Sequence, residues 1–141
     1  MKNRPNLVLA VVAAVAIVLA VVAWVFSASQ SSVDADPSTP EGTVQIYVKA
    51  LAENDDETVV SLLDPRLGCE VPLGTGYISN PVSLTLVSSK IDGDKAVVAF
   101  EVTEQGDSIY DTWSHREVFN LVRKDSGWML TEEPWPVYTC K

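Results

Sequence analysis

The pattern of apolar and polar positions changes twice along the chain. Residues 7–26, LVLAVVAAVAIVLAVVAWVF, contain no polar or charged side chain. Between residues 40 and 63 the apolar residues recur at helical spacing, and from residue 82 to residue 130 they alternate with polar ones. The pattern therefore predicts one continuous apolar helix, then a helical region, and then a series of strands.

The first apolar segment is long enough to cross a membrane. A helix rises about 1.5 Å per residue and needs about 20 apolar residues to span the hydrocarbon core. The hydrophobic region of a cleaved signal is shorter, about 7–15 residues, although the small residues at 27–29 would suit a signal peptidase. We therefore expect a transmembrane anchor over residues 6–27, with a cleaved signal as the alternative.

The distribution of charge predicts the orientation of this anchor. Lys2 and Arg4 precede it, and the first charges after it are acidic. The positive-inside rule then places residues 1–5 in the cytoplasm and the C-terminal part outside the cell membrane. That outer part holds all 19 acidic residues and the eight basic residues that remain of the chain's ten. Such a surface repels nucleic acid, so we expect no nucleic-acid partner.

The exported part is expected to begin with a spacer and two helices. Residues 28–38 are small, polar and interrupted by proline, which predicts a flexible linker. The sequence TPE at 39–41 is a helix start, and an apolar stripe follows over residues 44–51. A second, shorter helix is expected after the acidic break at 53–56, ending at the Asp-Pro pair of residues 64–65.

Strands follow these helices within a folded domain that we expect to cover residues 39–141. Alternation starts at Val82, a DGD turn closes the first hairpin at 92–94, and a long strand is expected over Ile109–Lys124. Trp128 opens the last strand. Helices followed by an antiparallel meander of about four strands predict an α+β domain, with the helices packed on one face of a curved, cone-like sheet.

The chain has two cysteines, Cys69 and Cys140, and both lie in the exported part. An even count in an oxidising compartment predicts one disulfide between them. Such a bond, closing a loop of about 70 residues, would stabilise the domain by roughly 4 kcal/mol on the chain-entropy model. The alternative is two buried thiols, because cysteine also packs as a small apolar residue.

The order of elements resembles the nuclear transport factor 2-like superfamily, a cystatin-like α+β cone. The residues that carry the resemblance are TPEGTVQIYVKALAENDDETVVSLLDP, and DKAVVAFEVTE followed by HREVFNLVRKDSGWMLTEE. The resemblance covers residues 39–133 and implies a fold more than a function, because the cone hosts many unrelated activities. The whole layout also resembles small membrane-anchored exported proteins of actinobacteria, including Mce-associated proteins. It resembles, less closely, the single-span assembly component of type IV secretion and conjugation machines.

Catalytic members of this superfamily place Asp, His or Tyr inside the cone, and His115 is the only histidine here. Strand alternation places Asp111, His115 and Glu117 on one side, with the last two close enough to pair. His115 is a single group that titrates near neutral pH, and no catalytic motif of the superfamily can be transferred to its surroundings. We therefore interpret it as part of a polar patch in the strand and not as a catalytic residue. We therefore predict no catalytic residue and no cofactor, and the ligand spacings of metal sites are missing as well.

The aromatic residues form a second candidate site. They could line one apolar cavity between helix and sheet, or they could fill the core, which a small domain needs in order to bury enough area. The set consists of Tyr47, Phe100, Trp113, Phe119, Trp128 and Trp135, with His115 beside them.

Together these features predict a non-catalytic binding or accessory domain of a cell-envelope complex. The membrane, through the N-terminal helix, and an envelope protein would be its partners. One alternative is a carrier or pocket enzyme for an apolar small molecule, of the ketosteroid isomerase or polyketide cyclase type that the resemblance implies. Another is an assembly component of a type IV secretion machine. A carrier or enzyme needs an open cavity, whereas a scaffold needs a filled cone and an exposed patch or sheet edge.

Overall fold

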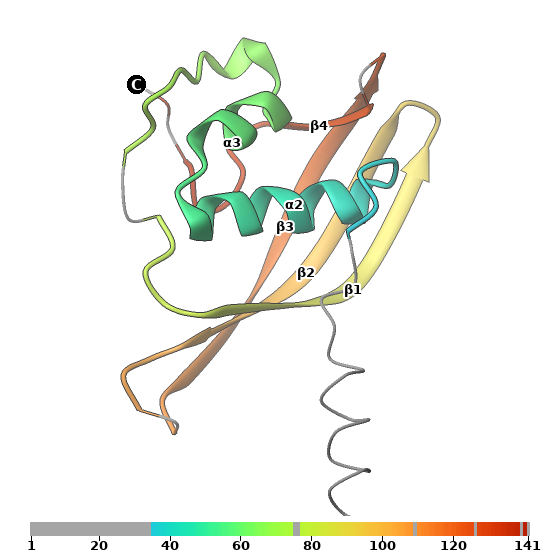
Figure 1. Ribbon diagram of the computed structural model, residues 1–141. Helices are drawn as coiled ribbons and strands as arrows, with labels where there is room; N and C mark the ends of the chain where they lie inside the picture. The colour runs from blue at the N-terminus through green and yellow to red at the C-terminus, as the bar shows by residue number, and fades with distance from the viewer. Residues whose placement is uncertain (1–34, 75–76, 109, 126, 139, 141) are drawn as a thin grey trace, which may run out of the picture. The chain divides into compact units, whose positions relative to one another are not determined.

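The computed structural model describes residues 35–140, apart from 75, 76, 109, 126 and 139. Its elements in chain order are α2 (Pro40–Glu53), α3 (Asp56–Leu62), the short 3-10 helix η1 (Pro65–Leu67), β1 (Val82–Asp92), β2 (Lys95–Gln105), β3 (Thr112–Lys124) and β4 (Gly127–Thr131) (Figure 1). The strands form one antiparallel sheet in the order β1-β2-β3-β4. The predicted α+β arrangement, with α2 and α3 on an open four-stranded sheet, is confirmed.

The predicted membrane anchor at residues 6–27 lies outside the described residues. The same holds for the stub at residues 1–5 and for most of the linker at residues 28–38. None of the helices that the structure describes combines the length and the hydropathy needed for a membrane crossing. The anchor and its orientation therefore stay predictions from the sequence.

Helix α2 begins where its sequence predicts, and the turn before it belongs to the fold. Oγ1 of Thr39 accepts a hydrogen bond from the N–H of Gly42 at 3.1 Å, which caps the helix. The N–H and hydroxyl of Thr39 both donate to the carbonyl of Asp36. Gly42 lies against that carbonyl, so a Cβ at this position would collide with the backbone of Asp36. The described part of the chain thus includes four residues before Thr39, where we expected the domain to begin.

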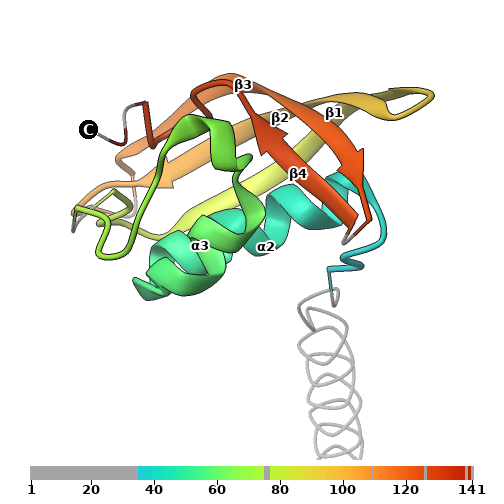
Figure 2. The same cartoon turned by 90° about the horizontal axis from the view of Figure 1, so that it is seen from above.

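Helices α2 and α3 pack on the same face of the sheet, which we call the inner face (Figure 2). Alternation along the strands turns every second side chain of β2 and β3 toward the helices, as the sequence predicted. The fully buried side chains come from both layers and include Val44, Tyr47, Val59, Val98, Phe100, Val102, Phe119 and Leu130. Each such side chain stabilises the fold by about 1.5–3 kcal/mol relative to an exposed one.

Strand β3 starts later than the sequence predicted. The alternation indicated a strand from Ile109, which itself lies outside the described residues, but β3 begins at Thr112. The N–H of Gly106 donates to the carbonyl of Asp111 at 2.7 Å, and the N–H of Asp111 donates to the carbonyl of Ser108 at 2.9 Å. These bonds close the turn between β2 and β3, so Asp111 belongs to the turn and not to the strand.

Strand β1 lies at the edge of the sheet and contains an irregularity. Its pairing with β2 is regular up to Leu86, shifts by one residue, and resumes at Ser88. Such a β-bulge bends the strand and interrupts its ladder of hydrogen bonds. Leu86 is 49% exposed although it lies on the inner face, so the helices do not cover the edge at this point.

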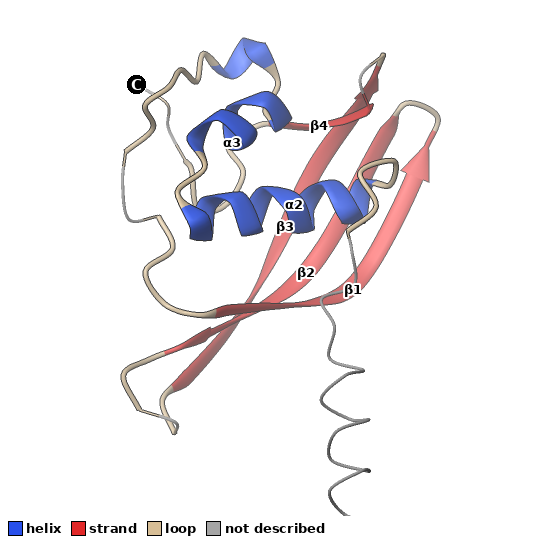
Figure 3. Ribbon diagram, in the orientation of Figure 1, coloured by secondary structure: helices blue, strands red, loops and turns tan. Residues whose placement is uncertain are grey.

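The C-terminal segment returns to the body of the domain and is fixed there by a disulfide. The hydroxyl of Tyr47 donates to the carbonyl of Pro134 at 3.4 Å, and Trp135 is buried. Cys140 is bonded to Cys69, with 4.8 Å between the Cα atoms, so the predicted pairing is confirmed. Cys69 lies at the start of the long loop between η1 and β1 (Figure 3).

Candidate functional site

The predicted aromatic set divides into a buried group and an exposed end. Tyr47, Phe100 and Phe119 are at most 1% exposed, and Trp128 is 3% exposed. The rings of Tyr47 and Phe100 both meet Phe119 edge to face, with centroid separations of 6.5 Å and 6.3 Å. Burial raises the pKa of Tyr47 above its ordinary value. These residues fill the space between α2 and the sheet as core.

The exposed end lies on the first half of β3. Trp113, His115 and Glu117 share the inner face because they are two residues apart. The register places Trp113 opposite Glu104 of β2, and His115 opposite Val102. The sequence predicted this face for the three β3 residues, but it did not indicate that the helices leave them partly open to solvent.

His115 is held between two tryptophans. Its ring stacks on Trp113, with centroids 4.6 Å and planes 28° apart, and meets the ring of Trp135 edge to face at 5.5 Å. Nε2 lies 3.4 Å from Oε1 of Glu117, which is the pair that the sequence indicated. Nδ1 is buried and makes no hydrogen bond within the described part of the chain. The imidazole is therefore positioned by packing more than by hydrogen bonds.

Trp113 differs from the rest of the set in its exposure. Fully 63% of its surface is exposed, and Tyr138 of the C-terminal segment is 54% exposed. Partial burial, and then the nearby carboxylate of Glu117, raise the pKa of Tyr138. Exposed rings and a carboxylate therefore share one region. We call it the aromatic mouth; it consists of Trp113, His115, Glu117, Trp135 and Tyr138.

The aromatic mouth is suited to recognition by stacking and by hydrogen-bond acceptance. Indole and phenol rings offer flat apolar faces, and the carboxylate of Glu117 accepts hydrogen bonds. Asp111, which the alternation placed on the same side of the strand as His115, lies in the β2–β3 turn instead. In the part of the chain that the structure describes, no three His, Cys, Asp or Glu side chains lie close enough to hold a metal ion.

A hollow of about 530 Å³ lies elsewhere, between η1 and the strands β2, β3 and β4. The buried carboxylate of Asp64 at its side accepts from Nε and Nη2 of Arg66 at 3.1 and 2.7 Å, and lies 3.4 Å from Nζ of Lys124. These hydrogen bonds and positive charges hold the pKa of Asp64 well below its usual range. The polar groups at this side of the hollow are therefore already paired with one another, and they join η1 to the end of β3.

No family model matches this sequence, and no curated protein matches it either. The fold is similar to a solved structure from Rhodopseudomonas palustris, a protein that contains a SEC-C motif. That match has a TM-score of 0.58 and 18% identity, over 69% of this chain and 78% of the other. An NTF-2 like protein of unknown function from Shewanella oneidensis MR-1 matches with a TM-score of 0.46 and 10% identity, over 62% of this chain and 88% of the other. The first similarity shows a shared fold alone, and the second is too distant to support a conclusion.

Sequence reasoning missed two parts of these sites. Tyr138 joins the aromatic mouth, and the sequence offered only its place in the aromatic C-terminal segment as a signal. The sequence indicates only a helix stop at Asp64, whereas in the structure its carboxylate also forms the ion pairs with Arg66 and Lys124. The Lys124 contact joins residues 60 positions apart in the sequence, so no local pattern could indicate it.

Proposed function

We propose that this chain is a membrane-anchored, extracytoplasmic binding domain of a cell-envelope complex, with a nuclear transport factor 2-like fold and no catalytic role. The observation that carries the proposal is the filled cone. Tyr47, Phe100 and Phe119 occupy the space that a carrier or pocket enzyme would need for its ligand. Recognition is then left to the surface, where the aromatic mouth is exposed.

Two features support the extracytoplasmic location. The bond between Cys69 and Cys140 is of the kind that persists in oxidising compartments. The apolar run at residues 7–26, preceded by Lys2 and Arg4, has the length and flanking charge of an anchor with its N-terminus inside.

The setting of His115 supports a role without catalysis. A general acid or base must reach the proton that it transfers, directly or through one water. Here Nε2 faces Glu117, Nδ1 is buried, and the side chain is 18% exposed.

The filled cone is tested by asking whether apolar probes enter it. We expect benzene and a steroid to leave the melting temperature of the full chain in nanodiscs unchanged. Phe119→Ala opens a cavity at the centre of the core, so benzene should raise the melting temperature of that variant. A rise for the wild-type chain with either probe would overturn the non-catalytic binding proposal and favour the carrier or enzyme.

The location is tested separately in intact cells. An external protease should remove a C-terminal tag and leave an N-terminal tag protected, and non-reducing peptide mapping should find Cys69 linked to Cys140. A protected C-terminal tag together with free thiols would contradict the extracytoplasmic location.

A further inference from the structure

The β2–β3 hairpin extends beyond the helices and carries part of the inner face with it. In Figure 1 its turn lies at the lower left, away from α2 and α3. Trp113 lies near this end of β3 and is 63% exposed, and Tyr110 in the turn is 90% exposed. An aromatic side chain this open, on a sheet face that is buried further along the same strand, is suited to recognition.

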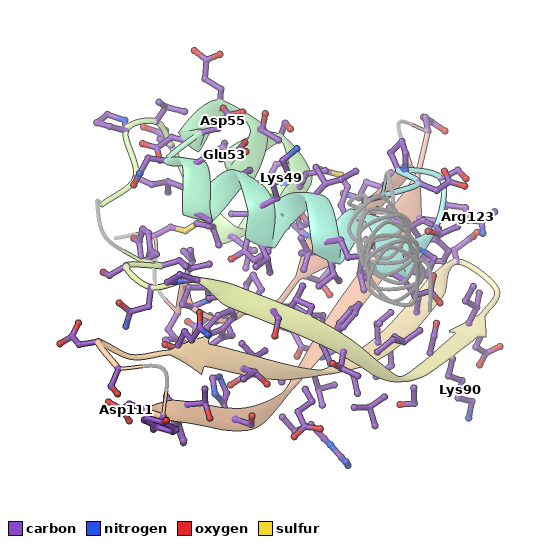
Figure 4. All side chains as sticks on the ribbon, turned by 60° about the horizontal axis from the view of Figure 1, so that its bottom comes forward. Lys49, Glu53, Asp55, Lys90, Asp111 and Arg123 are labelled. Atoms are coloured by element: carbon purple, nitrogen blue, oxygen red, sulfur yellow. A yellow bond between two sulfur atoms is a disulfide. The ribbon has the colours of Figure 1, made fainter. Side chains whose placement is uncertain are left out.

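The charged side chains around this exposed indole are acidic. Carboxylates lie opposite Trp113 on β2, further along the inner face of β3, and in the turn; they belong to Glu104, Glu117, Asp107 and Asp111. Figure 4 shows Asp111 at the end of the hairpin. Arg116 is on the outer face, paired in register with Glu101. Among the described residues, the inner face of β2 and β3 between positions 102 and 117 thus holds no lysine or arginine.

At the other end of β3, a cation already lies over the face of a tryptophan. Trp128 on β4 is opposite Arg123, and the guanidinium carbon lies 4.6 Å from the centre of the indole. A cation over an indole face is attracted by the ring's quadrupole. At the hairpin the residue opposite Trp113 is Glu104, so a cation there would meet an aromatic face and a negative charge together.

We propose that the inner face of the β2–β3 hairpin docks a basic peptide segment of a partner protein, with an arginine or lysine side chain against Trp113 and beside Glu104. This inference rests on the proposed function and names the chemistry of the partner. Charge complementarity selects this occupant, because the part of the chain after the predicted anchor carries 19 acidic residues against eight basic ones. A neutral glycan could stack on the indole but would gain nothing from the surrounding carboxylates.

The test measures fluorescence anisotropy of labelled peptides with the full chain in nanodiscs of neutral lipid. An arginine-rich peptide should bind at low salt, while its glutamate and glutamine counterparts should not. Trp113→Ala should weaken binding by about tenfold or more, and Trp113→Phe should keep most of it because an aromatic face remains. A cooperative thermal unfolding transition and an intact Cys69–Cys140 bond verify that each variant is folded.

The matched control lies on the same strand. Glu104→Gln removes a charge from the inner face and should weaken binding several-fold, whereas Glu101→Gln removes the same charge from the outer face and should leave it unchanged. Equal losses would show that affinity follows total charge and would overturn the assigned face. Binding of a neutral oligosaccharide through Trp113, without binding of the basic peptide, would overturn the assigned chemistry. Neither result would contradict the proposed function. The proposed function fails only if apolar probes enter the wild-type cone or if the domain is not exported.

Discussion

A tryptophan lies on the inner face at each end of strand β3, and the two tryptophans are in opposite settings. Near its C-terminal end, Trp128 of the neighbouring strand is 3% exposed and lies under the guanidinium of Arg123. Near its N-terminal end, Trp113 is 63% exposed and stacks on His115. A face of a sheet is therefore core only where another layer reaches it, and the same residue type becomes a recognition surface where that layer ends.

The lengths of the elements explain the difference. Helix α2 has 14 residues and is about 21 Å long, whereas the 13 residues of β3 span about 43 Å. One helix of this length cannot cover the whole strand. The uncovered part is the hairpin end, which holds Trp113 and Glu104.

The largest expected effect concerns the covered half of β3. Phe119→Ala should lower the free energy of unfolding by about 3–5 kcal/mol, because it removes a buried ring and leaves a cavity. Trp113→Ala, on the same face of the same strand, should lower it by about 1 kcal/mol or less, since most of that ring is exposed. Urea unfolding of the full chain measures both. Similar losses for the two variants would contradict the division between core and mouth.

The disulfide holds the segment that brings Trp135 and Tyr138 to the mouth. Replacing Cys69 and Cys140 by serine should reduce the free energy of unfolding by about 2–4 kcal/mol, because the unfolded chain is no longer cross-linked. Urea unfolding with and without reductant measures the effect, and the double serine variant should be indifferent to the reductant. A wild-type chain that is equally stable after reduction would show that packing alone holds this segment.

Asp64 joins η1 to the covered end of β3, and its removal should have a smaller effect that depends on pH. The pKa of Asp64 is lower in the folded chain than in the unfolded chain, so its ionised form stabilises the fold. The loss in Asp64→Asn should be about 1–3 kcal/mol at neutral pH, and it should shrink as the pH falls below the ordinary aspartate pKa of about 3.9. Urea unfolding of both chains across this pH range measures the difference. A difference that grows toward acid pH would contradict the ion pairs with Arg66 and Lys124.

The smallest expected effect concerns the imidazole at the mouth. His115→Phe keeps a flat ring between Trp113 and Trp135 and removes a buried nitrogen that makes no hydrogen bond within the described residues. The variant should therefore be as stable as the wild type or more stable by about 1 kcal/mol. His115→Ala, which loses the packing, is the control and should be less stable. A clear loss of unfolding free energy in His115→Phe would show that the contact with Glu117 stabilises the fold by more than the buried Nδ1 destabilises it.

Much of the fold could be predicted because its signals are local. The cap at Thr39, the DGD turn and the alternation through Val98, Phe100 and Phe119 each depend on neighbouring residues, and each was predicted. Alternation gives the face of a side chain but not the extent of the layer above it, so the exposure of Trp113 could not be predicted. The start of β3 was missed for a related reason, since the bonds that close the turn before it are made by the backbone.

The bulge in β1 has a consequence for chains that share a membrane surface. An edge strand with a continuous row of free N–H and C=O groups can pair with the same strand of a neighbouring copy. The shift between Leu86 and Ser88 breaks that row, and Lys90 adds a positive charge to each edge (Figure 4). If the chain is anchored, diffusion in two dimensions brings copies together often and in similar orientations. An edge that resists pairing then allows the domain to be crowded without forming sheets between copies.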